Sequence, residues 1–142
     1  MSWTPGIRRA ANSLAGLLLD THAFLWWLAG DARLSKRARS AISDESNDIF
    51  VSAATAWEIA TKVRLVKLPL PALEGAAMLR AITSQGFHEL SVTVAHGERA
   101  GSLAGDHRDP FDRMLIAQAH AEAMSIVSNE AIFEGFGVTR VW

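Results

Sequence analysis

The chain has 142 residues, of which 49% are hydrophobic and 20% are charged, and its formal net charge is −1 at pH 7. This length fits one domain with an ordinary core, and no apolar run reaches the roughly 18 residues of a membrane span. A near-neutral chain does not bind nucleic acid over its whole surface, so any such contact is local. The absence of cysteine excludes disulfides and thiolate metal sites and fits a reducing cytoplasm.

The start of the chain contains no apolar block long enough for a secretory signal. We expect residues 1–16 to form an extension and residues 17–142 to form the domain. Leu17–Leu19 then reads as a short strand buried on both faces of a sheet, and Asp20 follows it directly. Asp20 is either the cap of the next helix or the first member of a site, because the carboxyl end of a parallel strand opens into a ligand-binding crevice.

Helical and strand patterns alternate along the rest of the chain. In the first half we expect a helix through Phe24 and Leu28 that stops near Gly30, and then a helix Lys36–Ser43 capped by Ser35. A strand Ile49–Val51, ending at Ser52, should follow. The next helix should be capped by Ser52 or Thr55 and ended by Pro69 and Pro71. In the second half we expect a helix Leu73–Gln85, a strand Phe87–Val92, a short helix from Thr93 to about Leu103, a helix Phe111–Ala123 capped by Asp109, a strand Ser125–Ser128, a short turn or helix Ala131–Phe133, and a strand Val138–Trp142. Strands that alternate with helices across short loops predict an α/β fold, with a central parallel sheet of about five strands and helices on both faces.

Five acidic residues fall where such a sheet gathers the carboxyl ends of its strands: Asp20, Glu58, Asp109, Asp112 and Glu130. Each has an ordinary explanation as a helix cap, a turn residue or, for Glu58, half of an i,i+4 pair with Lys62. Two carboxylates about 4 Å apart repel by about 4 kcal/mol at an effective dielectric near 20, so several in one crevice need protons, basic partners or a divalent cation. Oxygen ligands without cysteine suit Mg²⁺ or Mn²⁺ rather than zinc, and such sites serve phosphoryl chemistry.

Four segments, in order LLLDTHAFLWWL, VSAATAWEIATK, HRDPFDRMLIAQA and IVSNEAIF, resemble a PIN domain. More narrowly, they resemble a bacterial VapC-type toxin, the ribonuclease half of a toxin–antitoxin pair. The resemblance covers about Leu17 to Trp142. It implies the PIN-like fold and a Mg²⁺-dependent endoribonuclease that hydrolyses RNA phosphodiesters and inhibits translation and growth.

The resemblance also carries over the family's metal-binding acids, one position at a time. Asp20, Glu58 and Asp112 match three such acids, and Asp109 is an additional acid that could be a ligand, a supporting residue or a cap. Glu130 stands where the family more often has aspartate, and it could bind the metal directly, through water or not at all. The implied catalytic residues are Asp20, Glu58, Asp112 and Asp109, with Mg²⁺ as the cofactor and Mn²⁺ as a possible substitute.

Several neighbouring residues are candidates for contact with the substrate or for support of the acids. Thr21 and Ser128 match hydroxyl positions that could steady a carboxylate or a phosphate. Lys62 is expected to balance Glu58, and Arg113 to neutralise the acids or meet the phosphate. His22 and His107 could contact the substrate or orient an acid, although a lone histidine is more often a packed or solvated residue.

The implied partners are an RNA substrate, a cognate VapB-like antitoxin and a second copy in a homodimer, with operator DNA bound only through the antitoxin complex and no membrane contact. The main alternative is a non-catalytic PIN-like binding module with an incomplete metal site. An aspartyl-phosphate phosphatase would need a second aspartate two residues after the first, where this chain has His22. Sequence-specific DNA binding by this chain alone is disfavoured by its near-neutral charge.

Overall fold

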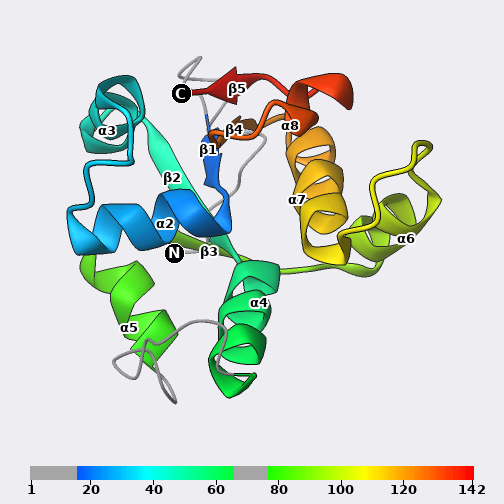
Figure 1. The fold of residues 1–142 in the computed structure, drawn as a ribbon, viewed down its shortest axis with the longest axis horizontal. Coiled ribbons are helices and arrows are strands. Elements are labelled where there is room, and N and C mark those ends of the chain that lie inside the picture. The colour runs from blue at the N-terminus through cyan, green and yellow to red at the C-terminus, as the bar shows by residue number, and fades with distance from the viewer. Residues whose placement is uncertain (1–15, 66–76) are drawn as a thin grey trace.

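The computed structural model describes residues 16–65 and 77–142, which form a parallel sheet with strand order β3-β2-β1-β4-β5 and helices on both faces (Figure 1). The strands are β1 Gly16–Leu19, β2 Asp48–Ser52, β3 His88–Leu90, β4 Ser125–Val127 and β5 Arg140–Val141. The helices are α2 Thr21–Ala29, α3 Lys36–Ser43, α4 Ala53–Arg64, α5 Ala77–Ser84, α6 Val94–Ser102, α7 Pro110–Ala121 and α8 Ile132–Gly135. The expected α/β fold is confirmed.

The central strand β1 is buried on both faces because its side chains alternate between two hydrophobic clusters. Leu17 and Leu19 pack in the cluster that includes residues of α2, α3 and α5. Leu18 packs on the opposite face with residues of α7 and with Phe133 of α8. A strand covered on both faces needs no alternation of polar and apolar residues, which explains the unbroken apolar run in the sequence.

The strand order creates a topological switch point between β1 and β4. The chain adds β2 and then β3 on one side of β1, and it then crosses back to place β4 on the other side of β1. The backbone N–H of Asp20 donates to the carbonyl of Val127 at 3.1 Å, so the β1–β4 ladder continues to the ends of both strands. Ligands of open α/β sheets bind outside the carboxyl ends at such a point, and Asp20 and Ser128 follow the two strands that flank it.

Helix caps agree with the expectations from the sequence. Ser35, Thr93 and Asp109 cap α3, α6 and α7 as predicted, and Gly30 ends α2 in the left-handed conformation with φ 63°. Of the two candidates for the cap of α4, it is Ser52 whose Oγ accepts the N–H of Ala54, at 3.0 Å.

Several elements are shorter than predicted: β4 and α5 each end one residue early, at Val127 and Ser84, and three others differ more. The ladder of β3 ends at Leu90 because its partner β2 ends at Ser52, and β5 pairs only through Arg140 and Val141 because β4 ends at Val127. Helix α7 stops at Ala121, since Ala123 turns into the left-handed region with φ 54°.

The predicted extension, residues 1–16, lies outside the described residues except for Gly16, which begins β1. Helix α4 ends at Arg64 with Leu65 as its C-cap, before the prolines at 69 and 71 that are expected to end it. Those prolines and the predicted helix start at 73–76 lie outside the described residues. No helix in the described ranges is long and apolar enough to cross a membrane.

Candidate functional site

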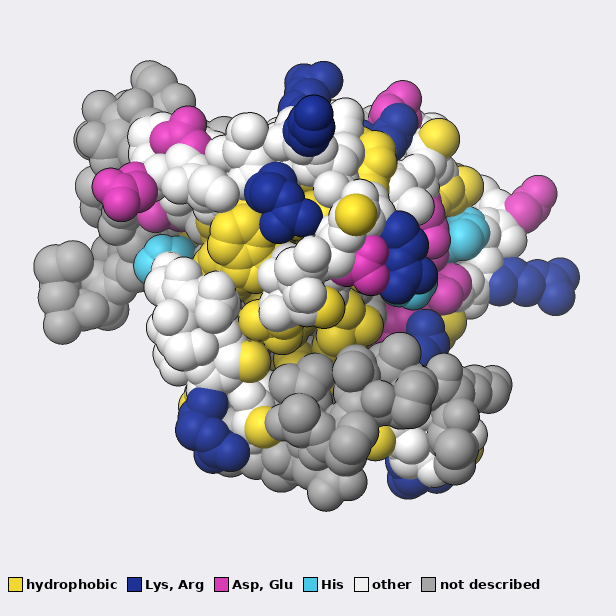
Figure 2. Space-filling view, turned by 60° about the vertical axis from the view of Figure 1, so that its left-hand side comes forward, with side chains coloured by type: hydrophobic (Ala, Val, Ile, Leu, Met, Phe, Trp, Pro, Cys, Tyr) yellow, Lys and Arg dark blue, Asp and Glu magenta, His cyan; other side chains and the backbone are white. Residues whose placement is uncertain are grey.

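Acidic side chains from four separate segments gather at the carboxyl edge of the sheet. Asp20 follows β1, Glu58 lies in the second turn of α4, Asp109 and Asp112 begin α7, and Glu130 follows β4. The charge of Glu130 raises the pKa values of both Asp20 and Asp112, and the charges of Glu58, Asp109 and Asp112 raise the pKa of Lys62. The five acids therefore form one electrostatic cluster. In the view of Figure 2, acidic side chains gather with Lys, Arg and His side chains to the right of centre.

Asp20 is both a helix cap and a member of this cluster. Its side chain is 5% exposed, and its Oδ1 accepts the backbone N–H of Ala23 at 2.8 Å. Burial raises the pKa of Asp20 to about 6, although hydrogen bonds from Ser128 and Ala23 and the charge of His22 oppose the shift. The charge of Glu130 adds to it. Ser128, as expected, steadies this carboxylate.

Both carboxylate oxygens of Glu58 have partners within the protein. The hydroxyl of Thr21 donates to Oε1 at 2.5 Å, and the ammonium of Lys62 binds Oε2. The expected Glu58–Lys62 ion pair is thus present, and Thr21 joins the start of α2 to α4. Burial alone would lower the pKa of Lys62, but the hydrogen bond and charge of Glu58, with Asp109 and Asp112, raise it.

Asp109 and Asp112 share the first turn of α7. Oδ1 of Asp109 accepts the backbone N–H groups of Phe111 at 2.9 Å and of Asp112 at 3.1 Å. Burial raises the pKa of Asp112, and the charges of Asp109 and Glu130 add to that effect against the hydrogen bond of His107. Nε2 of His107 lies 2.7 Å from Oδ2 of Asp112, so His107 orients an acid, one of the two roles considered for it.

Arg113 lies differently from the expectation, and the role left open for Glu130 stays a prediction. The guanidinium of Arg113 donates to the backbone carbonyls of Ala100, Leu103 and His107, and not to the acids. Glu130 is exposed, and its backbone N–H rather than its carboxylate bonds to Oγ of Ser128, at 2.9 Å. Glu130 therefore influences Asp20 and Asp112 through its charge, whereas Arg113 binds backbone carbonyls near the start of α7.

The donor set has the chemistry of a site for a hard divalent cation. It consists of carboxylate oxygens, and burial, with a smaller contribution from neighbouring acids, raises the pKa values of Asp20 and Asp112. In the described residues no three of His, Asp and Glu are already arranged to hold a metal ion. Within the protein, Glu58 is bound by Thr21 and Lys62, and Oδ2 of Asp112 by His107.

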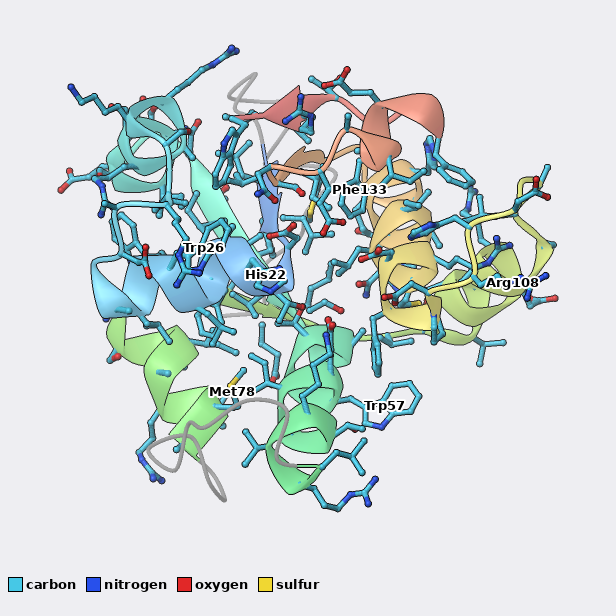
Figure 3. All side chains as sticks on the ribbon, in the orientation of Figure 1. His22, Trp26, Trp57, Met78, Arg108 and Phe133 are labelled. Atoms are coloured by element: carbon cyan, nitrogen blue, oxygen red, sulfur yellow. The ribbon has the colours of Figure 1, made fainter. Side chains whose placement is uncertain are left out.

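An apolar surface beside the acids was not predicted from the sequence. Trp57 is 64% exposed, although it directly precedes Glu58, and its ring meets that of Phe111 edge to face at 4.9 Å. Figure 3 shows Trp57 projecting outward from α4 on the side of α7. A hollow of about 450 Å³ opens here, with Val92 and Met114 in its lining. Helical spacing places Trp57 about 100° around α4 from the buried Glu58, but it does not tell which of the two directions the rest of the protein covers.

Fold and site together define an α/β protein with a carboxylate cluster at the switch point of a parallel sheet. The family model of the PIN domain matches residues 17–137, and the chain belongs to the PIN domain family.

Among curated proteins, Ribonuclease VapC16 of Mycobacterium tuberculosis is 41% identical over 69 residues, which is 49% of this chain and 48% of that protein. This match thus spans about half the length of that relative. Ribonuclease VapC22 of the same organism is 26% identical over 117 residues, covering 80% of this chain and 86% of that protein. The expected resemblance to VapC-type ribonucleases is confirmed.

Solved structures show the same fold at low sequence identity. The VapBC2 complex of Rickettsia felis, bound to a promoter DNA fragment, contains a chain that matches with a TM-score of 0.63 and 15% identity, covering 88% of this chain and 96% of that one. VapC20 of Mycobacterium tuberculosis, a Sarcin-Ricin loop cleaving toxin, matches with a TM-score of 0.58 and 17% identity, over 87% and 95% of the two chains.

The raised pKa of Asp20 predicts a pH-dependent gain in stability for Asp20→Asn. The unfolded carboxyl titrates near 3.8 and the folded one near 6, so the folded state binds more protons between these values. The free energy of unfolding contributed by Asp20 therefore falls as pH rises through this window. Asparagine keeps the cap without the charge, so at pH 7.5 and without divalent metal we expect Asp20→Asn to be more stable by on the order of 2 kcal/mol.

Urea unfolding between pH 4 and pH 8 measures this difference, which should close toward pH 4. The exposed Glu45→Gln removes the same charge and serves as the control. Millimolar Mg²⁺ should stabilise the wild type more than Asp20→Asn, since only the folded state binds it. If the difference in free energy of unfolding between wild type and Asp20→Asn does not change with pH, the pKa of Asp20 is not raised in the folded state.

Proposed function

We propose that this protein is a metal-dependent endoribonuclease that acts as the toxin of a VapBC-like toxin–antitoxin pair. It hydrolyses RNA phosphodiesters and so inhibits translation and growth. The observation that carries the proposal is the convergence of five acids at the switch point of a PIN-domain sheet. The similarity to proteins named ribonuclease VapC supports RNA as the substrate.

Asp20, Glu58 and Asp112 would hold the cation, with Asp109 or Glu130 in support. We propose Mg²⁺, with Mn²⁺ as a substitute. When bound, a divalent cation supplies Lewis-acid chemistry at the phosphodiester, activating water and stabilising the departing oxygen.

The chain's own residues prepare the site for this chemistry. Thr21 orients Glu58, Ser128 orients Asp20 and His107 orients Asp112. Lys62 brings a positive charge next to Glu58, where it can also meet the RNA phosphate. Products with a 3′-hydroxyl and a 5′-phosphate are expected.

The test is cleavage of a pool of structured RNAs by the purified chain free of any antitoxin. With Mg²⁺ or Mn²⁺ we expect cleavage, and EDTA or the double variant Asp20→Asn, Asp112→Asn should lower the rate by at least about 100-fold, because both changes remove the cation. Glu45→Gln again controls for charge. Cleavage that survives in EDTA and in the double variant would refute a metal nuclease, and a folded chain that neither cleaves RNA nor binds metal would favour the non-catalytic module.

His22 is a candidate contact for an unpaired RNA base. It is exposed, directly follows the Asp20–Thr21 pair, and its ring stacks on Trp26 with a centroid distance of 5.4 Å and an interplanar angle of 25°. The guanidinium of Arg33 lies 5.1 Å from the centre of the Trp26 ring. In Figure 3 His22 lies at the end of α2 that faces α4 and α7, and Trp26 lies farther along the helix. A supported ring next to the acids fits base stacking, which proteins use for unpaired RNA.

His22→Ala removes the ring and should cost about 1–3 kcal/mol, which is roughly a 5- to 150-fold loss in kcat/KM on a cleaved RNA oligonucleotide. His22→Phe should retain most of the activity because it preserves the stacking surface. The same oligonucleotide with an abasic residue next to the scissile bond should lose activity with the wild type but little more with His22→Ala. If Phe is as poor as Ala, stacking is not the role of His22.

The apolar surface around Trp57 supports a homodimer. Val92, which is 40% exposed, lines the same hollow as Trp57 and Phe111, and Val94, two residues farther along the chain, is 82% exposed. Large exposed apolar groups gathered in one place mark interaction surfaces. A second copy would cover them, and would bring a second acid cluster close because Trp57 and Phe111 directly precede Glu58 and Asp112.

Trp57→Glu places a charge in this surface and should weaken the dimer by roughly 30-fold or more, as expected for loss of a central aromatic contact. Sedimentation equilibrium measures the dissociation constant, and the thermal unfolding midpoint shows whether the variant folds. Leu79→Glu, on α5 and 49% exposed, is the matched control. A wild type that is monomeric at micromolar concentration would contradict the homodimer.

The proposed partners also include a cognate VapB-like antitoxin, with operator DNA bound only through the antitoxin complex. Support comes from the fold match to a chain of the VapBC2 complex, whose structure contains promoter DNA. A cytoplasmic location fits a cysteine-free chain whose substrate is RNA.

A further inference from the structure

We infer that Arg113 is a positioning residue for the metal-binding carboxylate of Asp112: its guanidinium clasps the α6–α7 loop, residues 103–109, and thereby presents His107 to Asp112. The inference rests on the proposed function only in taking Asp112 as a metal ligand. It gives Arg113 a role in the site without contact to the acids or to RNA.

The clasp consists of three hydrogen bonds from the three different nitrogens of the guanidinium. Nε donates to the carbonyl of Ala100 at 3.1 Å, Nη2 to that of Leu103 at 2.5 Å, and Nη1 to that of His107 at 3.1 Å. Ala100 and Leu103 lie in the last turn and at the C-cap of α6, where helix carbonyls lack intrahelical partners and the helix dipole is negative. The third hydrogen bond, to the carbonyl of His107, connects the guanidinium to the α6–α7 loop.

Two successive residues of α7 hold His107 from two directions. Arg113 binds its backbone carbonyl, while Oδ2 of Asp112 lies 2.7 Å from Nε2 of its ring. The ring also meets Phe136 edge to face at 6.5 Å. Backbone, ring edge and ring plane of His107 are thus all constrained, so its N–H is directed at one oxygen of Asp112.

This arrangement leaves the other oxygen of Asp112 ready for a ligand. Among the described residues, Oδ1 of Asp112 accepts no hydrogen bond, while Oδ2 is held by His107. Hydrogen bonds to a ligating carboxylate fix its orientation, and their loss typically costs 10- to 100-fold in metal affinity. Arg113 is suited to this task because its rigid, planar guanidinium donates from three separate nitrogens, whereas an ammonium has its donors on one nitrogen and cannot reproduce this spacing.

The α6–α7 loop passes close to the ring of Phe136 at Gly105. Gly105 has φ 113°, and a Cβ there would lie 3.1 Å from Cζ of Phe136. A side chain at this position would strain the backbone and press on the ring that supports His107. Gly105→Ala therefore moves the loop without altering Arg113, His107 or Asp112.

The test is Mn²⁺ binding to the full chain by isothermal titration calorimetry, without RNA, with the thermal unfolding midpoint measured for every variant. Arg113→Ala, His107→Ala and Gly105→Ala should each weaken binding by about 10- to 100-fold, and Arg113→Lys should not restore it. Because Arg113 acts through His107, the double variant Arg113→Ala, His107→Ala should bind within about threefold of His107→Ala alone. Arg99→Ala, an exposed arginine of α6, controls for loss of charge.

Three results would overturn the inference. Arg113→Ala could lower the unfolding midpoint while Mn²⁺ affinity stays within about twofold, which would make Arg113 only a cap of α6. The losses from Arg113→Ala and His107→Ala could multiply in the double variant, which would make them independent. A folded wild type that binds no Mn²⁺ would refute both this inference and the proposed function, whereas one that binds Mn²⁺ with the predicted pattern but cleaves no RNA would refute the proposed function alone.

Discussion

The burial of the Asp20 carboxylate at the end of β1 is the constraint on which the rest of the site depends. Because β1 is the middle strand and is covered on both faces, its carboxyl end has little access to water, and the pKa of Asp20 rises to about 6. The charge is tolerated because the first turn of α2 and Ser128 offer hydrogen bonds to it. The switch point between β1 and β4 then determines where α4 and α7 must deliver the other acids.

Several contacts serve the fold and the proposed chemistry at the same time. Asp20 and Asp109 cap helices while belonging to the acid cluster, and the Thr21–Glu58 hydrogen bond joins two helices. Such shared use keeps the acids close together even though like charges repel. Burial, with a smaller contribution from the neighbouring acids, raises the pKa values of Asp20 and Asp112, so keeping these carboxylates charged costs stability, as is common at functional sites.

An acidic site and a polyanionic substrate repel each other unless cations lie between them. The chain has a net charge of −1, so attraction must be local rather than spread over the surface. Lys62 and the proposed divalent cation supply positive charge at the acids, and the exposed His22 ring, stacked on Trp26, is proposed to bind a base beside them. Arg113, by contrast, donates its hydrogen bonds to backbone carbonyls of the protein and does not contact the acids.

The sequence alone was sufficient for the alternation of strands and helices, most helix caps and the five acids, because these depend on local patterns: apolar runs, a cap residue before a helix, an acid after a strand. The two roles left open for Asp20 turned out to be compatible, since one oxygen can cap α2 while the carboxylate stays in the cluster. Strand lengths were misjudged where a strand ends because its neighbour ends, as β3 does opposite Ser52. The direction of the Arg113 guanidinium, the exposure of Trp57 and the hold on His107 were decided by tertiary structure alone. Each depends on which segments the packed sheet and helices bring together, and residue spacing along one chain segment carries no information about that.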